Sequence, residues 1–321
     1  MATSTETEIA NLALQMVGGA RIAAGALRTE QSKNADEVRS CYHVLRRAEL
    51  RRNVWWFATR RAAMRPFGTD SRFVTFPAWA SGTTYAVNNV VLYSGQLYYS
   101  KIAGNLGNTP DTSFAQWSQY YGSDVAQLHV AGEKYLSAEL VYVGAAVYLS
   151  LNSANETTPP DASWLDLTGA TVATLVPIYP LGAGPVSSSD TRNIYVLPVG
   201  YMRMAPLDPK VGSVSQLGAS SAMAYGDELI EDRYLVTRDA GLKIIRFVAD
   251  IADPALFDPM FVAGFAARIA FTVCEPISQS TSKKAGIASE YLKFMSEARL
   301  VNGIETGPTE APEDDFISCR R

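Results

Sequence analysis

The chain has 321 residues, of which 47% are hydrophobic and 19% are charged, and its formal net charge is −4. These proportions are typical of a globular protein with a core, and the mild charge gives no global signal for nucleic-acid binding. Three scattered cysteines, Cys41, Cys274 and Cys319, do not indicate a disulfide framework.

Two helices are predicted near the amino terminus. Residues 5–17 carry apolar residues at helical spacing and are followed by Gly18-Gly19, a stop signal. Residues 31–53 show the pattern of a longer amphipathic helix. The bulky residues 54–57 then favour an extended conformation, so we expect a strand region over residues 54–76. The polar first eight residues lack the apolar region of a signal peptide.

A tandem repeat occupies residues 77–170. Equivalent residues lie 50 positions apart, as Tyr85 and Tyr135 do. Further matched pairs are Val91 and Val141, Tyr98 and Tyr148, Pro110-Asp111 and Pro160-Asp161, and, after a shift in register, Trp117 and Trp164. Each copy alternates short apolar runs with turn residues, which is typical of small hairpin-rich modules. We therefore predict two inserted β-modules, residues 77–125 and 126–170.

The chain after the repeat is predicted to be β-rich and then helical. Candidate strands are residues 194–198, 228–236 and 242–248, with loops at 182–190 and 206–221. A helix is expected to begin at Asp253-Pro254 and to end near Pro276, followed by a helix from about residue 278 to 301 that Asn302-Gly303 stops. Residues 304–321 are acidic and contain prolines. This C-terminal tail is either disordered or orders against a partner.

These elements predict an α+β fold. Neither end of the chain can bury its apolar helix faces alone, so we expect both ends to form one helical bundle. The bundle and a central β-region would make a frame of residues 1–76 and 171–303, with the two modules inserted between. The longest apolar stretch, residues 260–273, is interrupted by Arg268 and is too short to span a bilayer, so no membrane insertion is expected.

The sequence does not indicate an enzyme. The two histidines, His43 and His129, have no neighbouring cysteine or carboxylate at metal-ligand spacing, so neither a metal nor a cofactor is expected. The common nucleophile and phosphate-binding motifs do not occur. Neighbouring acids such as Asp227-Glu228 do not by themselves imply a catalytic cleft.

The outer frame resembles the tail tubular protein A family of short-tailed bacteriophages. The resemblance rests on the order of short motifs and covers about two thirds of the chain. The motifs are residues 11–18, the helix with Asn34-Ala35 and Arg46-Arg47, Trp55-Trp56-Phe57-Ala58, Leu197-Pro198, Tyr234-Leu235-Val236, Asp253-Pro254 and the last two helices. The resemblance implies a virion protein made in the host cytoplasm. Such a head-to-tail adaptor forms a dodecameric ring between the portal protein and the tail nozzle protein, and double-stranded DNA passes through it during ejection.

A basic stretch from Arg39 to Arg65 contains eight arginines and one acid, Glu49. Because arginine forms bidentate contacts with carboxylates, these residues are candidates for a portal or subunit interface. The candidates are Arg39, Arg46, Arg47, Arg51, Arg52, Arg60 and Arg61. The alternatives are a solvated face, ion pairs with acids such as Glu228 and Glu231, or contact with passing DNA. Trp55 and Trp56 are expected to be core or interface anchors.

The repeat resembles the chitin-binding modules of carbohydrate-binding families 5 and 12. Copy one follows their pattern with Trp79, Tyr85, Val90-Val91, Gly95, Tyr98, Pro110-Asp111 and Trp117. The resemblance makes Trp79, Tyr85, Tyr98 and Trp117 candidate contacts for a host glycan. Copy two has His129 and Ala145 in place of Trp79 and Gly95. A second hypothesis is therefore a glycan- or receptor-binding tail component. The alternative role of these aromatic residues is to hold a small β-module together.

Overall fold

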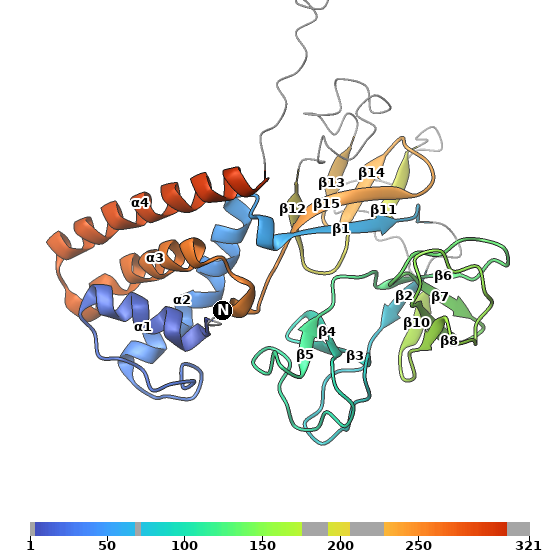
Figure 1. Cartoon of the computed structure of the whole chain (residues 1–321), viewed down its shortest axis with the longest axis horizontal. Coiled ribbons are helices and arrows are strands. Elements are labelled where there is room, and N and C mark those ends of the chain that lie inside the picture. The colour runs from blue at the N-terminus through green and yellow to red at the C-terminus, as the bar shows by residue number, and fades with distance from the viewer. Residues whose placement is uncertain (1–3, 68–71, 175–191, 206–227, 307–321) are drawn as a thin grey trace, which may run out of the picture. The chain divides into compact units, whose positions relative to one another are not determined.

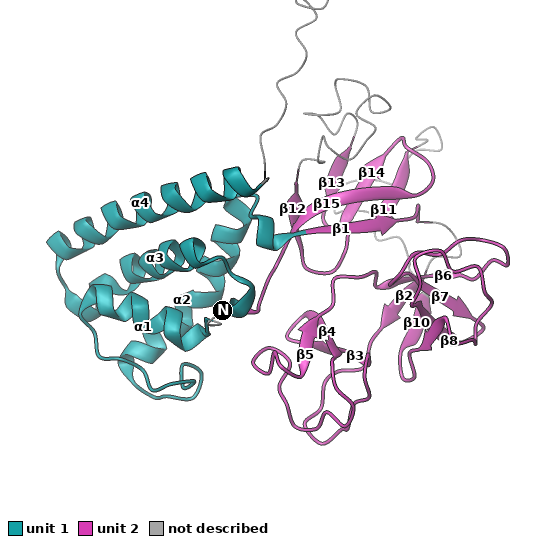
Figure 2. Ribbon diagram, in the orientation of Figure 1, with its two compact units in different colours: residues 1–59, 207–222, 254–321 teal, residues 60–206, 223–253 magenta. Residues whose placement is uncertain are grey.

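A computed structural model describes residues 4–67, 72–174, 192–205 and 228–306 (Figure 1). The described residues form a mixed α+β protein with four α-helices and fifteen strands, in agreement with the predicted fold class. They divide into two compact units (Figure 2). The helical unit contains the described residues up to Thr59 and from Pro254 onward, and the β unit contains those from Arg60 to Asp253. The predicted frame thus contributes residues to both units.

The helical unit contains α1 (Glu6–Val17), α2 (Lys33–Arg52), α3 (Pro259–Ser278) and α4 (Thr281–Thr306). Thr5 and Glu8 form a capping box at the start of α1, and Gly18 ends it in the left-handed conformation with a φ of 78°. Ser32 caps α2 through its hydroxyl, which accepts the Ala35 N–H. Local capping chemistry therefore accounts for both predicted amino-terminal helices.

Helix α3 is the core of the helical unit, since it packs against α1, α2 and α4. Its Phe261 and Phe265 are fully buried, and the rings of Trp55 and Tyr42 pack edge-on against them at 5.0 and 5.2 Å. By length and composition α3 could also cross a membrane. Its contacts with three helices are those of a buried core helix.

The structure corrects the predicted start of α3 and the predicted strand at residues 56–58. Helix α3 begins after Asp258 rather than Asp253, because the Asp258 carboxylate caps the Met260 and Phe261 N–H groups. Residues 254–256 form a 3₁₀ turn instead. Residues 56–58 also form a 3₁₀ turn rather than a strand.

Asn302-Gly303 does not stop α4, which continues to Thr306. The Asn302 side chain instead accepts a hydrogen bond from the Trp56 N–H at 2.8 Å and donates one to the Val54 carbonyl at 2.9 Å. Residues 304–306 of the predicted tail are therefore helical, and the rest of that tail lies outside the described residues.

Two of the sheets in the β unit contain the candidate strands 194–198 and 242–248, with small shifts of their bounds. One sheet has the order β1 (Thr59–Met64), β15 (Lys243–Ala249) and β12 (Tyr201–Met204). The other has the order β11 (Asn193–Val196), β14 (Tyr234–Thr237) and β13 (Leu229–Glu231). The predicted strand 228–236 is a hairpin, because Asp232 adopts a φ of 54° and turns the chain. The predicted loops at 182–190 and 206–221 lie outside the described residues.

The repeat supplies the other two sheets. Module 1 forms a sheet of β3 (Val90–Tyr93), β4 (Gln96–Ser100) and β5 (Trp117–Gln119). Module 2 contributes to a six-stranded sheet, whose order is β10 (Thr171–Thr174), β2 (Arg72–Thr75), β6 (Val125–Leu128), β7 (Leu140–Val143), β8 (Ala146–Ser150) and β9 (Trp164–Asp166). Module 2 is therefore continuous with β2 and β10, two strands that the sequence analysis assigned to the frame.

The two modules make the same hydrogen bonds at equivalent positions. The hydroxyls of Tyr85 and Tyr135 each accept a backbone N–H five residues upstream at 2.7 Å. Asn105 and Asn155 are buried, and their amides bond the hydroxyls of Ser100 and Ser150. The indole N–H groups of Trp117 and Trp164 both donate to backbone carbonyls. The sequence repeat is thus a repeat of three-dimensional structure.

Side chains alternate along a strand, so each hairpin has two faces. Each module buries both of them. Val91 and Tyr98 face a private aromatic core with Tyr85 and Trp117. The equivalent private core of module 2 contains Tyr135, Val141, Tyr148 and Trp164. The alternate positions of both hairpins meet in one shared core, which contains Val90, Leu97, Leu140, Val147 and Leu149 together with Val74 and Phe76. The shared core joins the two modules and β2 into one body.

We predict that Asn105→Ala and Asn155→Ala destabilise the protein by similar amounts. Each substitution leaves buried polar groups without a partner, which costs about 1–3 kcal/mol. The control Asn152→Ala changes an exposed side chain and should alter the free energy of unfolding by less than about 0.5 kcal/mol. Chemical denaturation of the three variants measures the effect. Loss of stability in only one of the two buried variants would contradict the structural equivalence of the modules.

Candidate functional site

The arginines of α2 fall into buried and exposed groups. Arg46 is only 5% exposed. Arg39 forms an ion pair with Asp36 at 3.0 Å and donates to the carbonyls of Leu27 and Glu30. Arg47, Arg51 and Arg52 are exposed. Of the interface candidates on α2, the exposed three are therefore the ones placed to meet another molecule.

The lone acid of the basic stretch, Glu49, is a buried structural group. It is 3% exposed and accepts a hydrogen bond from the Tyr291 hydroxyl at 2.7 Å. Arg52 donates to the same hydroxyl, and Arg268 lies 3.7 Å from the Glu49 carboxylate. Burial, together with the Glu49 carboxylate, raises the pKa of Tyr291 above its ordinary value. This cluster ties α2 to α3 and α4.

Arg60 and Arg61, the remaining interface candidates, belong to β1 in the β unit. The Arg60 guanidinium lies 5.2 Å from the centre of the Tyr121 ring, and Arg61 is exposed. Glu228, one of the acids considered as a partner from the sequence, pairs with Lys243. Asp227 lies outside the described residues.

Three of the four candidate glycan contacts are buried in the private core of module 1. Tyr85, Tyr98 and Trp117 are 6%, 2% and 1% exposed, and the Tyr85 and Trp117 rings pack edge-on at 5.2 Å. Trp79 is half-buried and packs edge-on against Tyr93 at 5.4 Å. Stacking on a sugar requires an exposed ring face, so the prediction is wrong for the three buried rings. They hold the module together instead.

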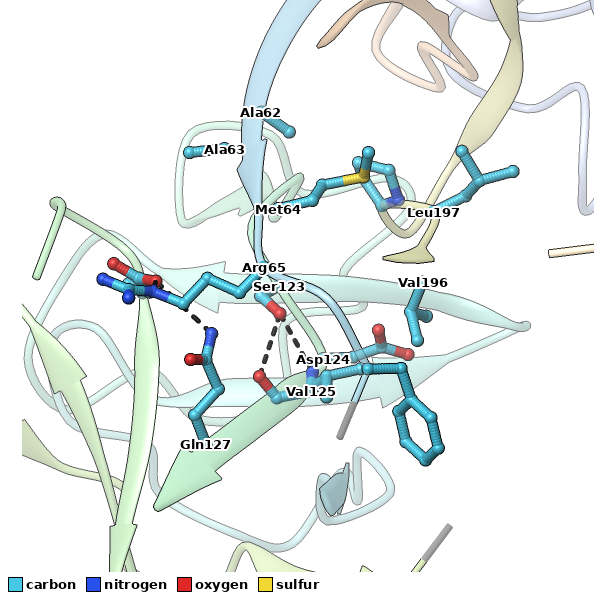
Figure 3. A pocket seen from close by; sticks show the side chains of 13 residues that line it. Ala62, Ala63, Met64, Arg65, Ser123, Asp124, Val125, Gln127, Val196 and Leu197 are labelled. Carbon is cyan, nitrogen blue, oxygen red and sulfur yellow. Dashed lines mark hydrogen bonds and ion pairs between the residues drawn. The ribbon is translucent and has the colours of Figure 1, made fainter. Parts of the chain in front are cut away.

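A cluster of charged side chains lies where Arg65 meets module 2 (Figure 3). The Arg65 guanidinium pairs with Glu133 and Glu139, and its Nε lies 2.5 Å from Glu139 Oε1. It also donates to the Lys134 carbonyl at 2.9 Å and lies 5.4 Å from the centre of the Tyr135 ring. Burial alone would lower the pKa of Arg65, but the carboxylates of Glu139 and Glu133 raise it above its ordinary value.

The two modules differ at two positions of this site. Glu133 and Glu139 stand where module 1 has Thr83 and Asn89. Glu139 keeps the turn-forming role of Asn89: its Oε2 accepts the Leu136 N–H at 2.8 Å, as Asn89 Oδ1 accepts the Ala86 N–H at 2.7 Å. Its second oxygen binds Arg65. Arg65 was recognisable in the sequence as part of the basic stretch, but its pairing with module 2 was not.

Comparisons with known proteins do not identify a family from which a function could be assigned. No protein-family model matches the sequence, and a search of curated proteins found no match. Within the described ranges, no group of three or more histidine, cysteine, aspartate or glutamate side chains lies close enough together to hold a metal ion. The arginine surface of α2 and the two modules are therefore the features from which a function has to be argued.

We predict that Arg65→Met lowers the free energy of unfolding by about 3 kcal/mol, because it leaves the buried Glu139 carboxylate without its cation. The matched control is Arg61→Met on β1, the strand that precedes Arg65, where the side chain is exposed and the expected change is below about 0.5 kcal/mol. Denaturation of both variants and of the double variant Arg65→Met/Glu139→Gln shows how much of the stability depends on the pairing of Arg65 with Glu139. Equal stability of the Arg65 and Arg61 variants would show that the ion pairs do not anchor module 2.

Proposed function

We propose that the protein is a structural component of a virion, a head-to-tail adaptor that forms a ring between portal and tail nozzle. The observation that carries the proposal is that helices from both ends of the chain pack around α3, while the β unit is one excursion between them. This arrangement suits the frame implied by the resemblance to tail tubular protein A. In the proposal the helices act as one bundle, the ring is a dodecamer, and its lumen passes double-stranded DNA.

The exposed arginines of α2 support a role for this helix in contacting a partner. Arg47, Arg51 and Arg52 follow one another within two turns and are exposed. A guanidinium binds carboxylates in a bidentate geometry, so an acidic face on the portal would match them. Contact with the DNA is a weaker explanation, because each phosphate contact adds affinity and a passage for DNA must release its cargo.

An apolar stripe on α4 supports association between subunits. Leu292, Leu300 and Ile304 are 64%, 67% and 72% exposed. Leu300 and Ile304 lie four residues apart and are therefore neighbours on one face of the helix. Exposed apolar side chains grouped in this way are typical of protein–protein contacts. In a closed ring the same modest contact is repeated at every subunit boundary, which stabilises the whole assembly.

We do not extend the proposal to glycan binding through the predicted aromatic platform. Three of the four rings on which that alternative rested, Tyr85, Tyr98 and Trp117, form the private core of module 1, and Trp79 packs against that core. In the adaptor proposal the modules are surface additions to the frame. Their surface chemistry, rather than their buried aromatic residues, then decides what they contact.

We predict that Arg47→Glu/Arg51→Glu weakens association with the cognate portal ring at least tenfold. Charge reversal places like charges opposite an acidic partner surface, which costs several kcal/mol. Co-sedimentation of the full chain with purified portal rings measures binding. The control Arg21→Glu/Arg238→Glu makes the same charge change at exposed arginines that are not part of α2. Equal binding by the two double variants would argue against α2 as the portal-binding element, and no association of the wild-type protein with the portal would refute the adaptor function.

A further inference from the structure

Module 1 contains an open cavity of about 240 Å³. Thr83, Thr84, Tyr85 and Asn89 line one side of it. Residues 167–170, which follow the last strand of module 2, line the opposite side, and Phe76, Pro77 and Ala78 lie between the two. The cavity is thus built by both modules and lies entirely within the β unit.

This cavity is the counterpart of the place that Arg65 occupies in module 2. The four residues on its first side correspond, 50 positions later, to Glu133, Lys134, Tyr135 and Glu139. All four of those residues contact Arg65. Module 2 therefore holds Arg65, a residue of a preceding segment of the same chain, at the position where module 1 has an open cavity.

The opposite walls of the two sites correspond as well. The Leu167 N–H donates to the Val147 carbonyl at 3.0 Å, and the Tyr120 N–H donates to the Leu97 carbonyl at 2.8 Å. After Tyr120 the chain reaches Ser123, which lines the cavity beside Arg65. After Leu167 the chain lines the cavity of module 1 in the same way. Each module's site is therefore lined by the segment that follows the last strand of the other module.

The chemistry of the two sites differs in charge. Module 1 has Thr83 and Asn89 in place of the two carboxylates that bind Arg65. Asn89 Oδ1 already accepts the Ala86 N–H, which leaves the Asn89 amide N–H groups to donate to an occupant. The threonine hydroxyls donate or accept. Tyr85 is the counterpart of Tyr135, whose ring lies against the flat guanidinium. The open site therefore suits a flat, uncharged group with a hydrogen-bond acceptor.

We propose that the module 1 cavity is a docking site for an extended segment of a partner protein, which inserts a glutamine or asparagine side chain. The occupant is a protein segment because a protein segment fills the equivalent site of module 2. A side-chain amide is flat and uncharged and carries an acceptor oxygen, so it matches Asn89 and Tyr85. The inference does not depend on the adaptor function, and failure of the portal-binding experiment would leave it standing.

The first test uses the full chain and a synthetic peptide of residues 62–67 that carries the substitution Arg65→Gln. We expect the peptide to shift the methyl NMR signals of Val90, Leu167 and Ala170, which lie at the cavity or beside it. Asn89→Asp keeps the acceptor for Ala86 but removes the donor, and it should weaken peptide binding at least tenfold. The exposed variant Thr112→Asp is the control. No shift with the wild-type chain, or equal binding by both variants, would overturn the proposal.

The second test copies the module 2 site into module 1. We expect Thr83→Glu/Asn89→Glu to bind the unmodified peptide of residues 62–67, with Arg65 retained, at least tenfold more tightly than the wild-type chain does. The control Ala103→Glu/Thr112→Glu adds the same charge at exposed positions of module 1. A folded variant that binds no better than this control would overturn the proposal. Shifts of the same methyl signals by N-acetylglucosamine oligomers but not by the peptides would also overturn it, in favour of a sugar.

Discussion

The β unit depends on one constraint: each hairpin of the repeat has to bury both of its faces. One face, with Val91 or Val141 at its centre, is covered by the module's own tyrosines and tryptophan. A module of this size has too few residues to cover the other face as well. Val90 and Leu140 therefore meet in the shared core, which also includes Val74 from β2. The tandem arrangement follows from this need, and so does the continuity of module 2 with the surrounding strands.

Once two copies share a core, their outer surfaces are free to diverge. The turn-forming oxygen is kept at Asn89 and at Glu139, but only the glutamate has a second oxygen for Arg65. Trp79 of module 1 packs on Tyr93, whereas its counterpart His129 stacks on Tyr135 at 5.5 Å. One copy is thereby docked on the chain itself, and the equivalent place on the other copy is open.

Much of the fold could be predicted from the sequence, because the signals were local or periodic. The 50-residue period located both modules, and the capping residues Thr5 and Gly18 located α1. The start of α3 was mispredicted because an Asp-Pro pair occurs twice, at 253 and at 258, and only Asp258 caps the helix. The end of α4 was mispredicted because the Asn302 side chain binds the distant Trp56 N–H. The Arg65–Glu139 pair joins residues 74 positions apart, so only the change from neutral to acidic residues between copies hinted at it. Alternation also does not show which face of a hairpin is exposed, so the sequence did not reveal that Tyr85, Tyr98 and Trp117 are buried.

The most direct test of the account is particle imaging of the purified protein mixed with its cognate portal ring. The adaptor proposal predicts a symmetric layer of twelve subunits added to one end of the portal, with the helical units of Figure 2 identifiable within each subunit. It also predicts density for the two modules as a single body, because they share one core. A bare portal alongside folded, monomeric protein would contradict the proposed function.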